Sequence, residues 1–216
     1  GIPVARIELV NALQMKAMNA CSGLDYDETP CLFLEFHGTD AGVAEQSELF
    51  GEIAADLGGG PFKWSALAED RKKLWQARHD AYWANLALRP GCKGLTTDVC
   101  VPISRLASCV ADTEKDIEEN NLIAPIVGHA GDGNFHVLLL IDDENQEEIT
   151  AAEEFVSRLN ERALQMGGTC TGEHGIGQGK IKFLEMELGG AVDVMRAIKQ
   201  KLDPDNIMNP GKIFRI

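Results

Sequence analysis

The chain has 216 residues, 44% of them hydrophobic and 25% charged, which is ordinary for a globular protein of one large domain or two small ones. Its formal net charge of −14 argues against nucleic acid or an anionic membrane as a main partner, because phosphate binding needs clustered Lys and Arg. The six cysteines include no Cys-x-x-Cys pair, so we expect a reduced, intracellular chain without a zinc ribbon or a thioredoxin-type site.

The hydropathy of the sequence and its first residues indicate what kind of chain this is. The longest uninterrupted aliphatic run, VLLLI at residues 137–141, is far too short to cross a bilayer, so no transmembrane segment is expected. The first residue is not Met, and the sequence opens directly into a strand-like segment. We therefore expect this chain to be a piece of a longer polypeptide.

The hydrophobic pattern of the first half predicts strands that alternate with helices. Strands are expected at residues 5–10 and 31–37, with a short helix ending at Met18 and longer helices at residues 41–57 and 67–88. In the last of these helices, Arg78 lies against the apolar stripe rather than opposite it. An arginine there is more often a paired structural residue, and a guanidinium that faces a cleft is the functional alternative.

The second half continues the alternation. Strands are expected at residues 95–101, 122–128 and 134–141, helices at residues 103–119, 147–166 and 191–202, and a turn with a strand in the tail NIMNPGKIF. The segments at 122–128 and 134–141 are apolar on both faces, which indicates an interior position in the sheet.

The turn between these two segments carries two histidines, in VGHAGDGNFH at residues 127–136. Asp-Gly between two apolar runs predicts a two-residue type I′ turn at Asp132 and Gly133, which would set His129 directly opposite His136. Directly opposed residues have Cβ atoms about 5 Å apart, so two imidazoles there can converge on one ion. The alternative is a hairpin that carries two unrelated histidines.

A second glycine-rich stretch, TCTGEHGIGQGK, covers residues 169–180. It is not a phosphate-binding loop, because His174 stands where GxxxxGK[ST] needs its first glycine and Ile181 follows Lys180. The dinucleotide fingerprint GxGxxG is absent too. Glu173 of this stretch would complete a three-ligand metal set with the two histidines, leaving a position open for water or substrate, and its neighbour His174 would then serve as a base.

Five motifs stand out along the chain: ARHDAYWA, RPGCKG, GHAGDGNFH, TGEHGIG and DPDNIMNPGK. Together they resemble the carboxy-terminal part of flavin-linked D-lactate dehydrogenases and related D-2-hydroxyacid dehydrogenases. These enzymes are members of the vanillyl-alcohol-oxidase-type flavoproteins. The resemblance covers essentially the whole chain. It implies an α+β fold with a largely antiparallel, ferredoxin-like sheet covered by helices. Residues 1–168 would form the substrate-binding domain, and residues 169–216 would pack on an FAD-binding domain that lies outside this chain.

The resemblance also implies the roles of individual residues. It assigns His129, His136 and Glu173 as ligands of a divalent metal, with zinc or manganese expected, and His174 as the general base. Other assignments concern the substrate and the flavin: Arg78 and Lys93 would grip the substrate carboxylate with Tyr82 nearby, and Asn209 would lie near the flavin. Leu138 stands where relatives that act on dicarboxylic hydroxyacids carry a polar residue, so a small monocarboxylate such as D-lactate is favoured.

The implied activity is FAD-dependent oxidation of a small D-2-hydroxyacid to the 2-oxoacid, with electrons passed on to an acceptor that the sequence does not identify. Alternatives are a glycolate-oxidase-like subunit, a D-2-hydroxyglutarate dehydrogenase and, in another class, a metal-dependent hydrolase. The expected compartment is the bacterial cytoplasm or the mitochondrion, with the protein soluble or peripheral to a membrane.

Overall fold

The computed structural model describes residues 2–216, which divide into two compact units and confirm the predicted α+β class. The first unit runs to Cys92 and includes Pro125–Gly131; the second comprises Lys93–Ala124 and Asp132–Ile216. The elements of the first unit are β1 (Val4–Val10), α1 (Ala12–Ser22), β2 (Cys31–Phe36), α2 (Asp40–Asp56), α3 (Ala68–His79), α4 (Ala81–Ala87) and β5 (Ile126–His129). Those of the second are β3 (Lys93–Thr96), β4 (Val99–Cys100), α5 (Ile103–Glu119), β6 (Asn134–Ile141), α6 (Gln146–Gln165), α7 (Ile181–Leu188) and α8 (Ala191–Leu202).

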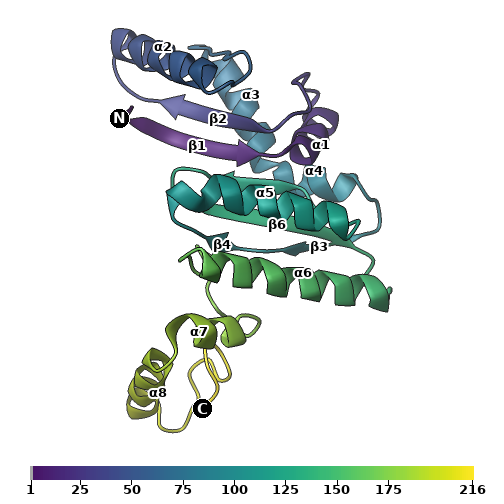
Figure 1. The fold of residues 1–216 in the computed structure, drawn as a ribbon, viewed down its shortest axis with the longest axis vertical. Helices are drawn as coiled ribbons and strands as arrows, with labels where there is room; N and C mark the ends of the chain where they lie inside the picture. The colour runs from purple at the N-terminus through teal and green to yellow at the C-terminus, as the bar shows by residue number, and fades with distance from the viewer. Residues whose placement is uncertain (1) are drawn as a thin grey trace. The chain divides into compact units, whose positions relative to one another are not determined.

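The first unit is a small antiparallel sheet with β1 in the middle. β2 pairs along one edge of β1 and β5 along the other, and α2 lies beside β2 (Figure 1). Side chains of β1, β2, α1 and α3 form the core: Val10, Met15, Met18, Phe33 and Ala77. Asn11 caps α1 by accepting a hydrogen bond from the Gln14 amide, and it also accepts one from the Ile126 amide, so it ties α1 to β5.

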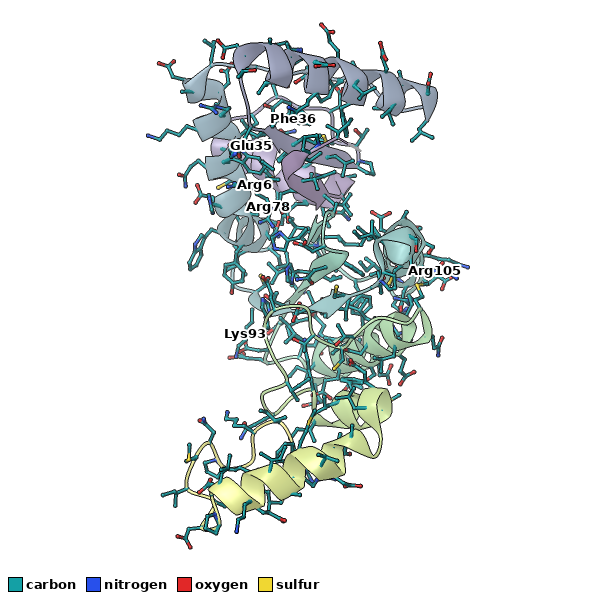
Figure 2. All side chains as sticks on the ribbon, turned by 90° about the vertical axis from the view of Figure 1, so that its left-hand side faces the viewer. Arg6, Glu35, Phe36, Arg78, Lys93 and Arg105 are labelled. Carbon is teal, nitrogen blue, oxygen red and sulfur yellow. The ribbon has the colours of Figure 1, made fainter. Side chains whose placement is uncertain are left out.

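Charged side chains also pair across this sheet. Arg6 and Glu35 are register partners on β1 and β2, with Arg6 Nε 3.8 Å from Glu35 Oε2 (Figure 2). Glu35 also contacts the His37 Nε2 at 3.0 Å. The Arg6 guanidinium also lies over the Trp75 ring of α3, 4.2 Å from the ring centroid, so α3 covers this face of the sheet.

The second unit is built around β6. Apart from Ile141 at its end, every residue of this strand is buried, as the apolar character of both its faces predicts. β3 and β4 pair antiparallel with successive parts of β6, and α6 packs against β4 and β6. α5 and α6 are joined by a buried carboxylate, Asp116, which accepts hydrogen bonds from Arg158 and Arg162 of α6.

The C-terminal part of the second unit contains α7 and α8, which pack on each other (Figure 1). Leu184, Val192 and Phe214 form a small core between these helices and the tail. No helix in residues 2–216 is long and apolar enough to cross a membrane.

Five elements differ from the sequence predictions. The strand expected over 122–128 forms only at Ile126–His129, and the helix α7 was not predicted. The helix expected over 67–88 is broken at Asp80, whose ψ of 2° leaves the helical range, while its carboxylate accepts hydrogen bonds from the Gln76 side chain. The strand expected over 95–101 is interrupted at residues 97–98, because Asp98 turns away to bind another segment of the chain. No strand forms in the tail, where Asn206 and Asn209 take positive φ values that suit turns.

Candidate functional site

The turn between β5 and β6 is wider than the two residues predicted. β5 ends at His129 and β6 begins at Asn134, and Ala130 donates its amide hydrogen to Ile7 O on β1. Type I′ geometry needs positive φ at both central residues, but Asp132 is not among the described non-glycine residues with positive φ. The type I′ prediction is therefore wrong, because Asp132, a residue with a Cβ, does not take the strained positive φ that this turn needs.

His129 belongs to the first unit, where it is held by a carboxylate. Its register partner on β1 is Glu8, and its Nδ1 lies 2.8 Å from Glu8 Oε1. A carboxylate accepts, so Nδ1 carries a proton, and in the neutral ring Nε2 carries the lone pair. Glu8 also accepts hydrogen bonds from Arg78 Nε at 3.0 Å and Nη2 at 2.8 Å. Burial acts to raise the pKa of Glu8, but the His129 hydrogen bond and the Arg78 charge outweigh it and lower this pKa.

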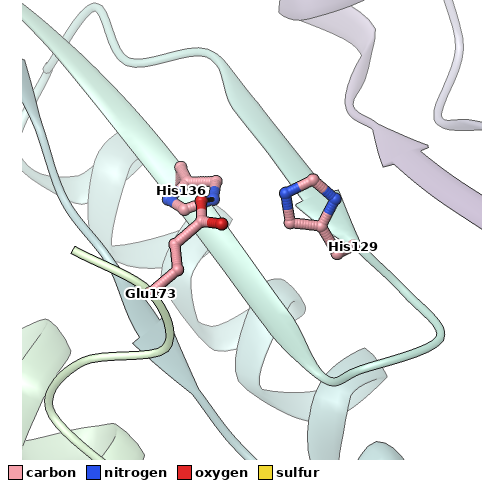
Figure 3. Close-up of side chains that lie close together, drawn as sticks. All are labelled: His129, His136 and Glu173. Atoms are coloured by element: carbon pink, nitrogen blue, oxygen red, sulfur yellow. Dashed lines mark ion pairs between the residues drawn. The ribbon is translucent and has the colours of Figure 1, made fainter. Parts of the chain in front are cut away.

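His136 belongs to the second unit and is buried on β6. Its Nδ1 donates to the Thr97 carbonyl oxygen at 3.0 Å, and its Nε2 lies 2.9 Å from Glu173 Oε1 (Figure 3). Burial lowers the pKa of His136, which favours the neutral ring. A neutral ring with its proton on Nδ1 points a lone pair at the Glu173 carboxylate. Two acceptors at this distance require a proton or a cation between them, so the pair fits a divalent cation.

Glu173 and His174 lie in a loop that Asp98 organises. The Asp98 side chain is fully buried and accepts hydrogen bonds from the Thr171 hydroxyl and from the backbone amides of residues 172–174, and it pairs with Lys180. Burial alone would raise the pKa of Asp98, but the Thr171 and backbone hydrogen bonds and the Lys180 charge hold it well below its usual range. Asp98 therefore fixes the path of the loop that presents Glu173 and His174.

Sequence reasoning overlooked Asp98, although a signal for it is visible in the segment TTDVCVP. A lone Asp in an apolar strand is costly to bury unless it is fully paired, so its presence there predicts a set of donors elsewhere in the fold. The partners themselves lie more than 70 positions away in the sequence, which is why the pattern alone does not identify them.

His174 lies next to the pair formed by His136 and Glu173. Its ring is stacked on the His136 ring with centroids 5.1 Å apart and an interplanar angle of 14°. Its Nε2 lies 3.5 Å from Glu173 Oε1, and about half of its side chain is exposed. A half-exposed imidazole beside two buried or paired groups is suitably placed to exchange protons with a bound molecule.

The structure also places the predicted substrate and flavin residues. Arg78 is on α3 and bound to Glu8, while Tyr82 on α4 is exposed and meets Trp83 edge-to-face. Lys93 begins β3 with a largely exposed side chain and pairs with Asp143 at 3.3 Å. Asn209 lies in the C-terminal tail with a φ of 45°. Arg78 and Tyr82 belong to the first unit and Lys93 and Asn209 to the second, and their roles stay predictions.

His129, His136 and Glu173 each offer one ligand atom to a metal, a ring nitrogen or a carboxylate oxygen. In both histidines Nδ1 is committed as a donor, to a carboxylate in one and to a backbone carbonyl in the other. This is the arrangement in which metal-ligating histidines are held by their surroundings, with Nε2 directed at the ion. The donor chemistry therefore fits a divalent cation.

The fold is that of a domain found in flavin-linked oxidases. The chain belongs to the family of FAD linked oxidases, whose C-terminal domain matches residues 1–213. It is 49% identical to a probable mitochondrial D-lactate dehydrogenase of Danio rerio, over 100% of this chain and 44% of the relative. It is 42% identical to the mitochondrial D-lactate dehydrogenase (cytochrome) of Arabidopsis thaliana, over 99% of this chain and 38% of the relative.

A more distant relative is the glycolate oxidase subunit GlcD of Escherichia coli (strain K12), 28% identical over 98% of this chain and 43% of that protein. The chain thus spans about two fifths of the length of these curated relatives. Among solved structures, p-cresol methylhydroxylase with substrate bound superposes with a TM-score of 0.63 at 14% identity, over 97% of this chain and 47% of that one. The 4-ethylphenol oxidase from Gulosibacter chungangensis has a TM-score of 0.64 at 14% identity, over 97% of this chain and 48% of that one. At this identity the superposition demonstrates a shared fold.

Proposed function

We propose that this chain is the substrate- and metal-binding part of an FAD-dependent dehydrogenase that oxidises D-lactate or a similar small D-2-hydroxyacid to the 2-oxoacid. The observation that carries the proposal is the buried His136 whose Nε2 faces the Glu173 carboxylate, with His174 stacked on the same ring. His136 on β6 and Glu173 in the loop form a ligand pair, and the same loop carries His174 as a neighbouring base. Relatives named D-lactate dehydrogenase, aligned over essentially the whole chain, support the reaction class.

The metal is proposed to be held by Nε2 of His129, Nε2 of His136 and a carboxylate oxygen of Glu173. The connection between the two histidines is only six residues long, which keeps them near each other whatever the conformation of the turn. When bound, a divalent cation supplies a positive charge that favours ionisation of a neighbouring hydroxyl group. Zinc and manganese are the proposed metals, because imidazole and carboxylate ligands suit both.

The chain's own residues are proposed to position the substrate and to move one proton. Arg78 and Lys93 hold the substrate carboxylate by charge-assisted hydrogen bonds, with Tyr82 four residues after Arg78, on α4. His174 accepts the hydroxyl proton at a ring nitrogen. FAD, held mainly by a domain outside this chain, supplies the hydride acceptor. Leu138 is 5% exposed on β6, and its apolar side chain supports a small monocarboxylate over a dicarboxylate.

The C-terminal segment, residues 169–216, is proposed to pack on the FAD-binding domain of the same polypeptide, with Asn209 near the flavin. Large apolar side chains that are more than half exposed on α8 and in the tail support this proposal: Val194, Ile198, Leu202, Ile207, Met208 and Ile216. An apolar patch of this kind on a domain surface is typical of an interface. The names of the relatives support a mitochondrial location.

A glycolate oxidase subunit is the second candidate, supported by the similarity to GlcD. A substrate panel on the full-length, flavin-loaded enzyme separates the two: D-lactate, glycolate and D-2-hydroxyglutarate are mixed with enzyme in a stopped-flow instrument, and flavin reduction is followed by absorbance. We expect D-lactate to reduce the flavin fastest and metal removal by chelation to slow this step. Fastest reduction by either other acid would reassign the substrate.

His174→Ala tests the proposed base. We expect flavin reduction by D-lactate to fall by 10² to 10⁴, roughly the contribution of a general base, while flavin and metal content stay at the wild-type level. His37→Ala is the matched control, because His37 is an exposed histidine that also contacts a glutamate, Glu35. Undiminished flavin reduction in His174→Ala would remove the assigned role. Hydrolytic turnover without flavin would instead favour a metal-dependent hydrolase.

A further inference from the structure

Glu8 is a buried carboxylate in the middle of β1 that the proposed reaction does not use. Its side chain is 8% exposed, and each of its two oxygens has its own partner. Oε1 meets His129 Nδ1 at 2.8 Å, and Oε2 accepts two hydrogen bonds from the Arg78 guanidinium, at 2.8 and 3.0 Å. A carboxylate is rarely buried without such pairing, so the three side chains act as one unit within the first part of the fold.

The geometry determines what Glu8 does for each partner. Because Glu8 and His129 are register partners on neighbouring strands, the carboxylate reaches the near nitrogen of the ring and keeps the proton there. This leaves Nε2 as the nitrogen with the lone pair, which is the form that binds metal. On the other oxygen, two donors of the planar guanidinium are held at once, which fixes the orientation of Arg78.

We propose that Glu8 is a positioning residue that sets both the metal-binding tautomer of His129 and the orientation of Arg78. The inference rests on the proposed function, since it concerns the metal ligand and the carboxylate-binding arginine of that same site. It adds a residue from the first strand of the chain, more than 60 positions from any other member of the site. Glu8 touches neither substrate nor metal in this assignment and acts only through its two partners.

Glutamine at this position retains the shape of glutamate but does not serve both partners. Its amide has one oxygen and one NH₂ group, so if the oxygen accepts from Arg78, the NH₂ group faces His129 Nδ1. The histidine then moves its proton to Nε2, which removes the lone pair from the metal-binding nitrogen. Loss of a group that orients a metal-ligating histidine typically weakens metal binding by about 10- to 100-fold.

The test uses the full-length, flavin-loaded enzyme after metal removal, titrated with Zn²⁺ or Mn²⁺ by calorimetry. We expect Glu8→Gln to weaken metal binding by about 10- to 100-fold. Glu35→Gln is the matched control, because Glu35 also lies on a strand of the same sheet and contacts an arginine and a histidine, Arg6 and His37. We expect its metal affinity to equal that of the wild type.

A second pair of variants separates the two roles and guards against misfolding. Arg78→Met leaves the Glu8–His129 contact in place, so we expect an increased KM for D-lactate with unchanged metal affinity. The double variant Glu8→Gln/Arg78→Met leaves no buried guanidinium without its carboxylate partner. We therefore expect it to fold and still to bind metal weakly. Circular dichroism and the melting temperature establish that each protein is folded.

The outcomes distinguish this inference from the proposed function. If the wild type binds metal and the double variant binds it as tightly as Arg78→Met, the positioning role of Glu8 is overturned while the proposed function stands. If the wild-type enzyme binds no divalent metal, or if D-2-hydroxyacids do not reduce its flavin, the proposed function itself fails. Weak metal binding confined to the two variants that lack Glu8 supports the inference.

Discussion

Replacing Asp98 by Asn is expected to release the loop that carries Glu173 and His174. The wild-type carboxylate accepts from the Thr171 hydroxyl at 2.7 Å and from the His174 amide at 2.9 Å, and it pairs with Lys180 at 3.3 Å. An asparagine of the same shape keeps one acceptor oxygen but points its NH₂ group at groups that are themselves donors. The charge that compensates Lys180 is also lost.

The size of the effect follows from these contacts. A hydrogen bond to a charged group contributes about 1.5–3 kcal/mol, but such contributions within one network do not add. Removing one partner of a buried ion pair costs about 3–5 kcal/mol. Lys180 is 18% exposed and regains some hydration, so we take the lower limit, about 3 kcal/mol, for opening of the loop. At 1.4 kcal/mol for each factor of ten, this corresponds to a roughly hundredfold larger open population.

Hydrogen–deuterium exchange of the full-length protein measures this population directly, through peptides that cover residues 170–178. We expect the Asp98→Asn variant to exchange these amides roughly a hundredfold faster than the wild type, with the rest of the chain little changed. Asp112→Asn, an exposed aspartate on α5, is the control and should leave the loop unchanged. Loop exchange in Asp98→Asn within a few-fold of the wild type would refute the anchoring role.

Two further predictions concern stability. The hydrogen bonds to Arg158 and Arg162 outweigh the effect of burial and lower the pKa of Asp116 from 3.8, so its contribution to folding stability is present above pH 3.8 and is lost as the pH falls through the lower folded value. In urea unfolding, Asp116→Asn should therefore be less stable than the wild type by about 3 kcal/mol, constant from about pH 8 to pH 5 and smaller only below pH 3.8. A stability difference that disappears by pH 5 would contradict this. A Cβ on Gly168 would lie 2.2 Å from the Cys100 carbonyl oxygen, whereas a Cβ on Gly179 would meet open space. Calorimetry should therefore find Gly168→Ala less stable than the wild type by about 1–3 kcal/mol and Gly179→Ala within about 0.5 kcal/mol of it. Equal melting temperatures of the two variants would show that the backbone at Gly168 moves easily to admit a Cβ.

Local sequence patterns predicted the elements whose burial is regular. The helix expected at 103–119 and the helix expected at 191–202 form with those bounds, and the strand expected at 134–141 is buried as its apolar faces indicate. Periodicity is reliable here because each element meets its surroundings along one continuous face or, for β6, on both faces. It failed at Asp80 and at residues 97–98, where a single side chain finds partners that the periodicity does not encode.

The candidate site divides in the same way. The motifs are ordered along the whole chain, so they were enough to predict the family. They also indicated His129, His136, Glu173 and His174 as a group. Only the tertiary structure identified the residues that hold that group in place. Glu8 meets His129 across 121 positions and Asp98 meets His174 across 76, and such partners come together only through strand pairing and loop return. In the sequence, a carboxylate such as Glu8 or Asp98 is only an isolated charge. Its role follows from its hydrogen-bond donors, and these are brought to it by the tertiary structure.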